Sequence, residues 1–124
     1  MIKKILLMED IKECKIDNNG DFKYIQISCV NKIDNNKSKL IIRGSSFFSQ
    51  HKQIFDDFLI EIKNSKNNNL IQNYEYKCIG GGKIEITGKT ISVYGTSVTF
   101  GQADHYKTIE IIKKYYQNKM VINI

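Results

Sequence analysis

The chain has 124 residues and a net charge of +6, and 41% of its residues are hydrophobic. This length suits a single domain over residues 1–124 that buries about two thirds of its unfolded surface, and the apolar content excludes a disordered chain. No apolar run is long enough to span a bilayer, so we expect no membrane partner. The lysines are scattered among asparagines, which indicates solvated loops; a nucleic-acid surface needs basic and aromatic residues gathered on one face.

The N-terminal segment and the cysteines both bear on the cellular compartment. Residues 1–8 are basic and then apolar, but Glu9 and Asp10 follow at once without a small-residue cleavage site. We therefore expect an edge strand there and no signal peptide. The cysteines are odd in number, far apart and without C-x-x-C spacing, which favours reduced thiols packed in a cytoplasmic protein. They are Cys14, Cys29 and Cys78.

Two strand patterns precede the first helical pattern. Asp17–Gly20 is a strong turn signal, and residues 22–30 alternate after it, with Lys23 on the same face as three apolar side chains. A short apolar run at residues 40–43 predicts the next strand.

A helix is expected next. Apolar residues recur at three- and four-residue spacing from Phe47 to Ile62, and Ser45 or Ser46 is the expected N-cap. His51 falls on or beside the apolar stripe, early in this helix. We therefore expect its side chain to point toward the sheet.

The second half of the chain predicts more strands and a second helix. Alternation indicates strands over residues 74–79, 83–87 and 90–94; Gly80–Gly82 breaks or kinks the first of these, and Gly88–Lys89 forms a tight turn. Asp104 is the expected N-cap of the second helix. A last strand is expected over residues 119–124. The apolar face of the helix comprises Thr108, Ile109, Ile112 and Tyr115 or Tyr116.

The element order predicts an α+β fold: a single mixed or antiparallel sheet with helices packed on it. Hairpin-type alternation of the strands and two amphipathic helices support this class. The chain shows no internal repeat and no second domain.

The segment from Val93 to His105 carries the clearest chemistry. A strand runs into a turn rich in glycine and hydroxyl residues, and the turn opens a helix. Such a junction can direct backbone N–H groups toward one spot, and the helix start adds partial positive charge there. This arrangement is typical of an oxyanion site such as one for phosphate.

Other familiar sites fail on spacing. Gly88–Thr90 matches the end of a P-loop, but Lys83 stands where the earlier glycine is required. None of the cysteines is followed six residues later by the arginine of a cysteine phosphatase. The two histidines lack clustered carboxylates, and Asp17–Gly20 lacks the spaced ligands of a calcium loop. We therefore expect no metal and no cofactor.

His51 is open to two interpretations. A helical histidine is commonly satisfied by a backbone carbonyl and has no further role. An apolar-facing histidine is costly unless it has a partner, however, and this chain also carries an oxyanion-type turn that can approach it. The combination favours a functional histidine.

Six motifs occur in order over most of the chain: Phe22-Lys23-Tyr24, Ile42-Arg43-Gly44, His51, Cys78–Lys83, Val93-Tyr94-Gly95-x-Ser97 and Phe100-Gly101-x-Ala103-x-His105. Together they resemble the 14-kilodalton phosphohistidine phosphatases, the janus family. The resemblance implies a sheet of about six strands flanked by two helices. It also implies a metal-independent enzyme that removes phosphate from histidine, with other N-phosphorylated residues as a wider substrate class.

The resemblance further implies the site residues. His51 matches the catalytic histidine, and His105 matches a second histidine whose place at a helix start favours a structural or secondary role. Lys83 stands where the family has arginine, which keeps the charge but loses bidentate geometry. Gln50 and Thr96 stand where the animal enzyme has tyrosine, and Thr99 replaces a smaller residue. The implied phosphate-binding positions are Lys23, Arg43, Lys83, Ser97, Val98 and Thr99.

The expected mechanism is positioning and charge stabilisation around a phosphoryl group. His51 acts either as the nucleophile on phosphorus or as the general base for water, and the sequence leaves both routes open. The expected partners are histidine-phosphorylated proteins, with no nucleic acid, and the expected state is a monomer. A non-catalytic, phosphate-recognising regulatory protein of the janus type is the alternative.

Overall fold

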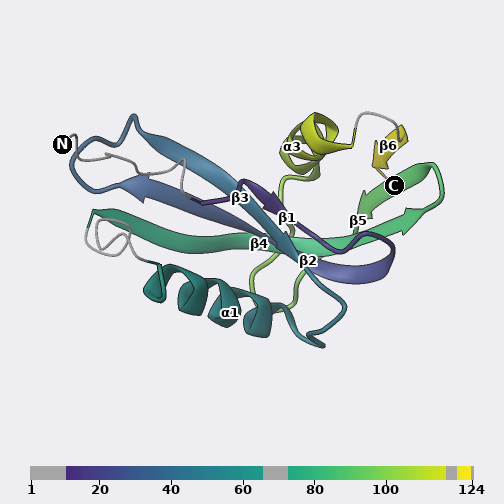
Figure 1. Ribbon diagram of the computed structural model, residues 1–124, viewed down its shortest axis with the longest axis horizontal. Coiled ribbons are helices and arrows are strands. Elements are labelled where there is room, and N and C mark those ends of the chain that lie inside the picture. The colour runs from purple at the N-terminus through teal and green to yellow at the C-terminus, as the bar shows by residue number, and fades with distance from the viewer. Residues whose placement is uncertain (1–10, 66–72, 117–119, 124) are drawn as a thin grey trace.

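The computed structural model describes residues 11–65, 73–116 and 120–123 of the chain. One mixed sheet of six strands carries a helix on each face (Figure 1). The elements are β1 (Cys14–Lys15), β2 (Gly20–Asn31), β3 (Ser38–Gly44), α1 (His51–Lys63), β4 (Tyr74–Thr87), β5 (Thr90–Tyr94), α3 (His105–Tyr115) and β6 (Met120–Asn123). The strand order is β1-β3-β2-β4-β5-β6, with parallel pairing at the two outer pairs and antiparallel pairing inside. The predicted α+β class is therefore confirmed.

The core has two halves because successive strand side chains point to opposite faces. Ile25 and Ile27 of β2 belong to the half that packs against Phe58 of α1. Tyr24 of the same strand belongs to the other half, together with Ile112 of α3. The central strand β2 therefore contributes to both halves.

β4 is one continuous strand, so its three glycines do not end it. Its register against β2 shifts between Gln26 and Ile27, which marks a β-bulge. Beyond the bulge, Gly81 lies opposite Ile25, on the face that carries α1. The bulge thus changes which residues of β4 face each helix.

The predicted start of the first helix is wrong. α1 begins at His51, and its N-cap is Gln50 rather than Ser45 or Ser46. The side-chain oxygen of Gln53 accepts a hydrogen bond from the Gln50 N–H at 3.0 Å, which satisfies one free donor at the helix start. The two serines instead make hydrogen bonds outside the helix.

The remaining elements follow the predictions closely. Asp104 is the N-cap of α3, and its carboxylate accepts the N–H groups of Tyr106 and Lys107. The last strand is confirmed as β6, whereas the strand expected at residues 1–8 lies outside the described residues. The short strand β1 was not predicted, because two residues are too few to show a period. None of the helices in the described part of the chain is long and apolar enough to cross a membrane.

The three cysteines, all within the described residues, form no disulfide, and burial raises the pKa of each thiol to about 11. At neutral pH such thiols are almost wholly protonated and are poor nucleophiles. Cys29 and Cys78 are buried, as predicted, and Cys14 is half-buried.

Replacement of Phe58 tests the core beneath α1. Its side chain is 1% exposed and packs edge-on against Tyr76 at 5.5 Å between ring centroids. We expect Phe58→Ala to lower the free energy of unfolding by about 3–5 kcal/mol, measured by urea denaturation. The control is Leu59→Ala, because Leu59 is 39% exposed and its truncation should cost less than about 1 kcal/mol. Equal losses in the two variants would contradict the packing described.

Candidate active site

A pocket of about 320 Å³ opens beside the N-terminus of α1. Its walls come from β2, β4, the loop before α1 and the loop after β5. The lining residues are Lys23, Ser49, Gln50, His51, Lys83, Thr96, Val98 and Thr99. The fold thus brings together five predicted site residues, His51, Lys23, Lys83, Val98 and Thr99, and leaves Arg43 and Ser97 outside the lining.

His51 is the first residue of α1 and is 8% exposed. Its Nε2 lies 2.9 Å from the carbonyl oxygen of Gly82. A carbonyl can only accept, so Nε2 carries the hydrogen, and in the neutral ring Nδ1 holds the lone pair. Nδ1 has no hydrogen-bond partner among the described residues. Every fully buried side-chain nitrogen or oxygen in that part of the chain does have a partner, so Nδ1 is not fully buried. Nδ1 is therefore open to solvent at the pocket.

The approach of His51 to β4 depends on Gly81. A Cβ atom at this position would lie 2.8 Å from Cδ2 of His51 and 3.0 Å from Cβ of Ser97. Any side chain here would push the imidazole away from the strand. The middle glycine of the triplet therefore makes room for the candidate catalytic ring.

Two lysines face each other beside His51. Lys23 of β2 and Lys83 of β4 are directly opposed in the antiparallel register, a pairing of like charges that destabilises a sheet. Lys83 has a partial counter-ion, because its Nζ lies 3.5 Å from Asp21 with both side chains about 40% exposed. Lys23 makes no ion pair within the described residues. The pocket thus concentrates positive charge that the rest of the sheet does not neutralise.

The loop after β5 supplies neutral donors. Two backbone hydrogen bonds join Ser97 and Gly101, and the Ser97 Oγ accepts the Phe100 N–H at 3.0 Å. Val98 and Thr99 lie at the tip of this closed turn. Their N–H groups have no acceptor in the described part of the chain, although both residues line the pocket. Backbone amides without an acceptor, near two lysines, are chemically suited to an oxyanion, and phosphate binding by Val98 and Thr99 stays a prediction.

Ser97 and Arg43 have other surroundings. Ser97 is 2% exposed, and its hydroxyl holds the turn closed as described above. Arg43 is 4% exposed; its guanidinium donates to the Glu61 carboxylate at 3.3 and 3.1 Å. Their direct contact with phosphate stays a prediction, while the structure gives each of them a hydrogen-bonding role.

His105 lies behind the pocket in a buried hydrogen-bond chain. Its Nε2–H donates to the carbonyl of Gly95 at 2.7 Å, and its Nδ1 is 2.6 Å from the Tyr24 hydroxyl. Burial raises the pKa of Tyr24, so this hydroxyl keeps its proton and can donate it to Nδ1 of His105. Thr108 contacts the same hydroxyl at 3.0 Å, and Gln26 donates to Thr108 at 3.0 Å. These hydrogen bonds anchor Gly95, the first residue of the turn after β5.

Sequence reasoning missed most of this buried hydrogen-bond network. The one available signal was the alternation of β2, which places Tyr24 and Gln26 on the face opposite Lys23. With Ser28 they make three polar residues beside the apolar Phe22 and Val30 on this face, which indicates a polar network, but the partners of Tyr24 and Gln26 lie about 80 residues away.

Metal binding finds no support in the described residues. Within them, no three or more side chains of histidine, cysteine, aspartate or glutamate gather to hold an ion. Metal independence stays a prediction.

Comparison with known proteins matches residues 8–120 to the model of the Janus/Ocnus family (Ocnus). The 14 kDa phosphohistidine phosphatase of Sus scrofa is 31% identical over 120 residues, covering 92% of this chain and 90% of its own length. The Homo sapiens protein of the same name is 31% identical over 112 residues, which covers 86% of this chain and 84% of the length of that protein. The sex-regulated protein janus-A of Drosophila pseudoobscura pseudoobscura is 33% identical over 108 residues, covering 83% and 68%.

Because Lys23 and Lys83 repel each other, removing one charge should stabilise the fold and weaken anion binding. We expect Lys23→Gln to raise the free energy of unfolding by about 0.2–1 kcal/mol, because it removes the repulsion from Lys83. Added phosphate should raise the melting temperature of the wild type more than that of the variant. Lys77→Gln is the control, since Lys77 on β4 lies opposite Ser28 and not opposite a lysine. A Lys23→Gln variant that is destabilised, or that responds fully to phosphate, would contradict this assignment.

Proposed function

The chain belongs to the Janus/Ocnus family, and we propose that it is a protein phosphohistidine phosphatase, an enzyme that hydrolyses the P–N bond of phosphohistidine. One observation carries the proposal. A histidine with a free Nδ1 shares a pocket with two opposed lysines and two unpaired backbone amides. The proposal includes other N-phosphorylated residues as a wider substrate class.

The proposed binding mode follows the donors around the pocket. The ammonium groups of Lys23 and Lys83 neutralise phosphoryl oxygens, and the N–H groups of Val98 and Thr99 bind them without adding charge. Lysine at position 83 acts as a point charge, so it tolerates more phosphate orientations than an arginine fork. The same donors stabilise the charge on the oxygens as phosphorus is transferred.

His51 has two possible routes, and both use the same lone pair. In direct attack, Nδ1 forms a bond to phosphorus while the substrate's P–N bond breaks; the substrate imidazole, protonated on its other nitrogen, keeps the bonding pair and leaves as neutral imidazole. Water then hydrolyses the new P–N bond. In general-base catalysis, Nδ1 takes a proton from the water that attacks phosphorus. In either case the Gly82 carbonyl stabilises the positive ring through Nε2–H.

The wider setting follows from the same assignment. We infer that histidine-phosphorylated proteins are the substrates, and that the enzyme acts as a cytoplasmic monomer without metal, cofactor or nucleic acid. The scattered lysines and the reduced-thiol pattern support these inferences.

A second candidate function is a phosphate-recognising regulatory protein without turnover. The match to janus-A leaves this function open, because the name of that relative states no catalytic activity. The pocket would then bind a phosphorylated partner and release it unchanged.

Phosphate release from a phosphohistidine peptide tests the proposal. With a chelator present, we expect turnover by the wild type and a loss of at least about 100-fold in kcat for His51→Ala. Lys52→Ala is the control, because Lys52 is the next residue of α1 and, among the described residues, its exposed side chain pairs with Asp56 alone. A folded wild type that binds the peptide without turnover would favour the regulatory function. Turnover that survives in His51→Ala would show that another residue is the catalytic group.

A quench experiment separates the two routes. Direct attack predicts phosphate on His51 when the enzyme is mixed with substrate and quenched in alkali, in which phosphohistidine is stable. Mass spectrometry of the peptide that contains His51 measures it, and the Lys23→Gln variant should accumulate less because its phosphoryl group is held more weakly. An unmodified His51 during rapid turnover would assign the general-base route.

A further inference from the structure

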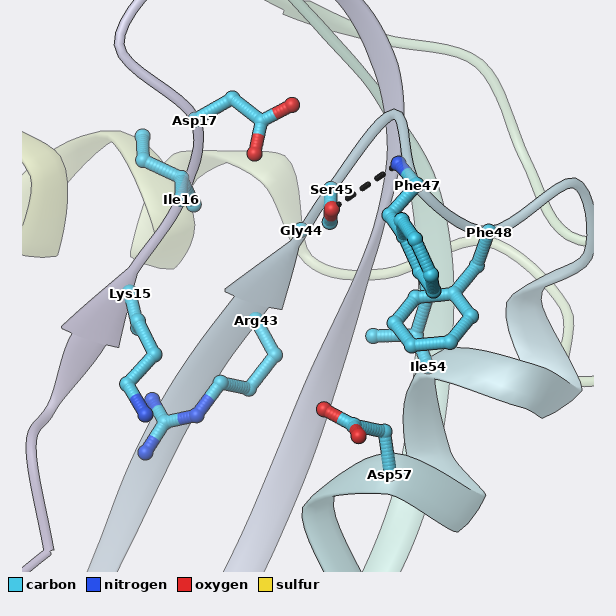
Figure 2. A pocket seen from close by; sticks show the side chains of 10 residues that line it. All are labelled: Lys15, Ile16, Asp17, Arg43, Gly44, Ser45, Phe47, Phe48, Ile54 and Asp57. Atoms are coloured by element: carbon cyan, nitrogen blue, oxygen red, sulfur yellow. Dashed lines mark hydrogen bonds between the residues drawn. The ribbon is translucent and has the colours of Figure 1, made fainter. Parts of the chain in front are cut away.

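A second pocket, of about 370 Å³, is lined by residues of β1, β3, α1 and the loop before α1 (Figure 2). The loop before α1 connects the two pockets. Ser45, Phe47 and Phe48 line the second pocket, and Ser49, Gln50 and His51, which follow directly, line the first. A polypeptide bound at His51 can therefore extend into the second pocket.

One side of the second pocket is aromatic. Phe47 is 85% exposed and meets Phe48 edge-on, with ring centroids 5.0 Å apart. Figure 2 shows the two rings on one side of the pocket, Lys15 and Arg43 on the other, and the carboxylate of Asp57 between them. Such exposure of a phenylalanine costs free energy, and a ligand that covers the ring recovers it.

Three of the charged side chains that line the second pocket have partners within the protein. Lys15 and Arg43 both bind Glu61, at 3.5 and 3.1 Å. Burial alone would raise the pKa of Glu61, but the hydrogen bond and charge of Arg43, helped by Lys15, hold this pKa below its usual value. Asp17 accepts hydrogen bonds from Ser46.

Asp57 is different from these residues. Its carboxylate has no hydrogen bond and no ion pair within residues 11–65, 73–116 and 120–123. It lies in the pocket together with the aromatic wall. A carboxylate beside exposed rings suits a long cationic side chain, whose methylene stem packs on the rings while its charged end reaches the carboxylate.

We propose that this pocket is a substrate subsite that binds a lysine or arginine side chain of the phosphorylated polypeptide. The proposal rests on the proposed phosphatase function, because it needs a peptide anchored at His51. A phosphate in the first pocket and a cation in the second would fix the direction of the peptide across the sheet.

The sheet register sets the distance between the two subsites. Lys15 and Arg43 are paired across β1 and β3, and Lys23 and Lys83 are paired across β2 and β4. These pairs are two strand spacings apart across the sheet, and Lys23 lies two residues along β2 from Ile25, which is the partner of Arg43, so the pairs are about 12 Å apart. An extended peptide covers that distance in about three to four residues, and the long side chains at its two ends add reach. The basic residue is therefore expected about three positions from the phosphohistidine.

The test uses phosphohistidine peptides that differ at one position. Lysine, norleucine or glutamate is placed three residues before the phosphohistidine in one series and three residues after it in another. We expect kcat/KM for lysine to exceed that for norleucine by about three- to tenfold in one series, with glutamate lowest. Free phosphoramidate, which has no peptide, reports the chemistry of the first pocket alone.

Two variants on one turn of α1 assign the preference. Asp57→Asn should make kcat/KM about equal for the lysine and norleucine peptides and leave phosphoramidate hydrolysis unchanged. Asp56→Asn removes the same charge, but its carboxylate is bound by Lys52 at 3.0 Å, so the preference for lysine should persist. Phe47→Ser should lower kcat/KM for the lysine peptide and again spare phosphoramidate.

Several results would overturn the proposal. Equal rates for lysine and norleucine in both series would do so, and so would a preference that persists in Asp57→Asn. Faster turnover of the norleucine peptide would assign the pocket to an apolar side chain. If phosphoramidate is not hydrolysed, the phosphatase function fails separately. The subsite is then tested by binding. The same peptides carry a non-hydrolysable phosphohistidine analogue, and the lysine peptide is expected to bind about three- to tenfold more tightly than the norleucine peptide.

Discussion

The ring of His51 can donate to the Gly82 carbonyl only because β4 has no side chain at residue 81. The hydrogen bond spans 2.9 Å, and a Cβ at Gly81 would lie 2.8 Å from the ring. This contact fixes the first turn of α1 against the sheet and leaves Nδ1 as the free nitrogen. The tautomer of the histidine and the position of its lone pair therefore depend on one residue without a side chain.

The same triplet of glycines admits the second histidine from the opposite face. A Cβ at Gly82 would lie 2.6 Å from Cε1 of His105 and 2.5 Å from the carbonyl oxygen of Tyr94. His105 in turn holds Gly95, where the chain leaves β5 for the oxyanion-type turn. The two histidines thus contact neighbouring residues of one strand: His51 presents a nitrogen without a hydrogen-bond partner among the described residues, and His105 holds the start of the turn after β5. A flat β4 with ordinary side chains could do neither.

Much of the fold could be predicted from the sequence because its signals are local. Alternation identified the main strands, Asp104 marked the start of α3, and the early helical position of His51 directed it toward the sheet. The cap of α1 could not be found this way, since Gln50 is a weak cap whose donor is satisfied by Gln53. Serines nearer the expected start were the stronger local signal.

Long-range pairing limited the prediction of the site. The resemblance grouped Arg43 with the phosphate-binding residues, but its guanidinium is committed to Glu61, which is on a different element. No periodicity indicates such a pairing; it depends on how α1 lies over β3. Likewise, Lys23 and Lys83 are 60 positions apart in the chain and become neighbours only through the bulged register of β2 and β4. Where the sequence carries charge alone, the fold decides whether that charge is neutralised, as at Arg43, or left available, as at Lys23. The uncompensated charges of this face, positive at Lys23 and negative at Asp57, are the ones a phosphorylated and partly basic polypeptide would complement.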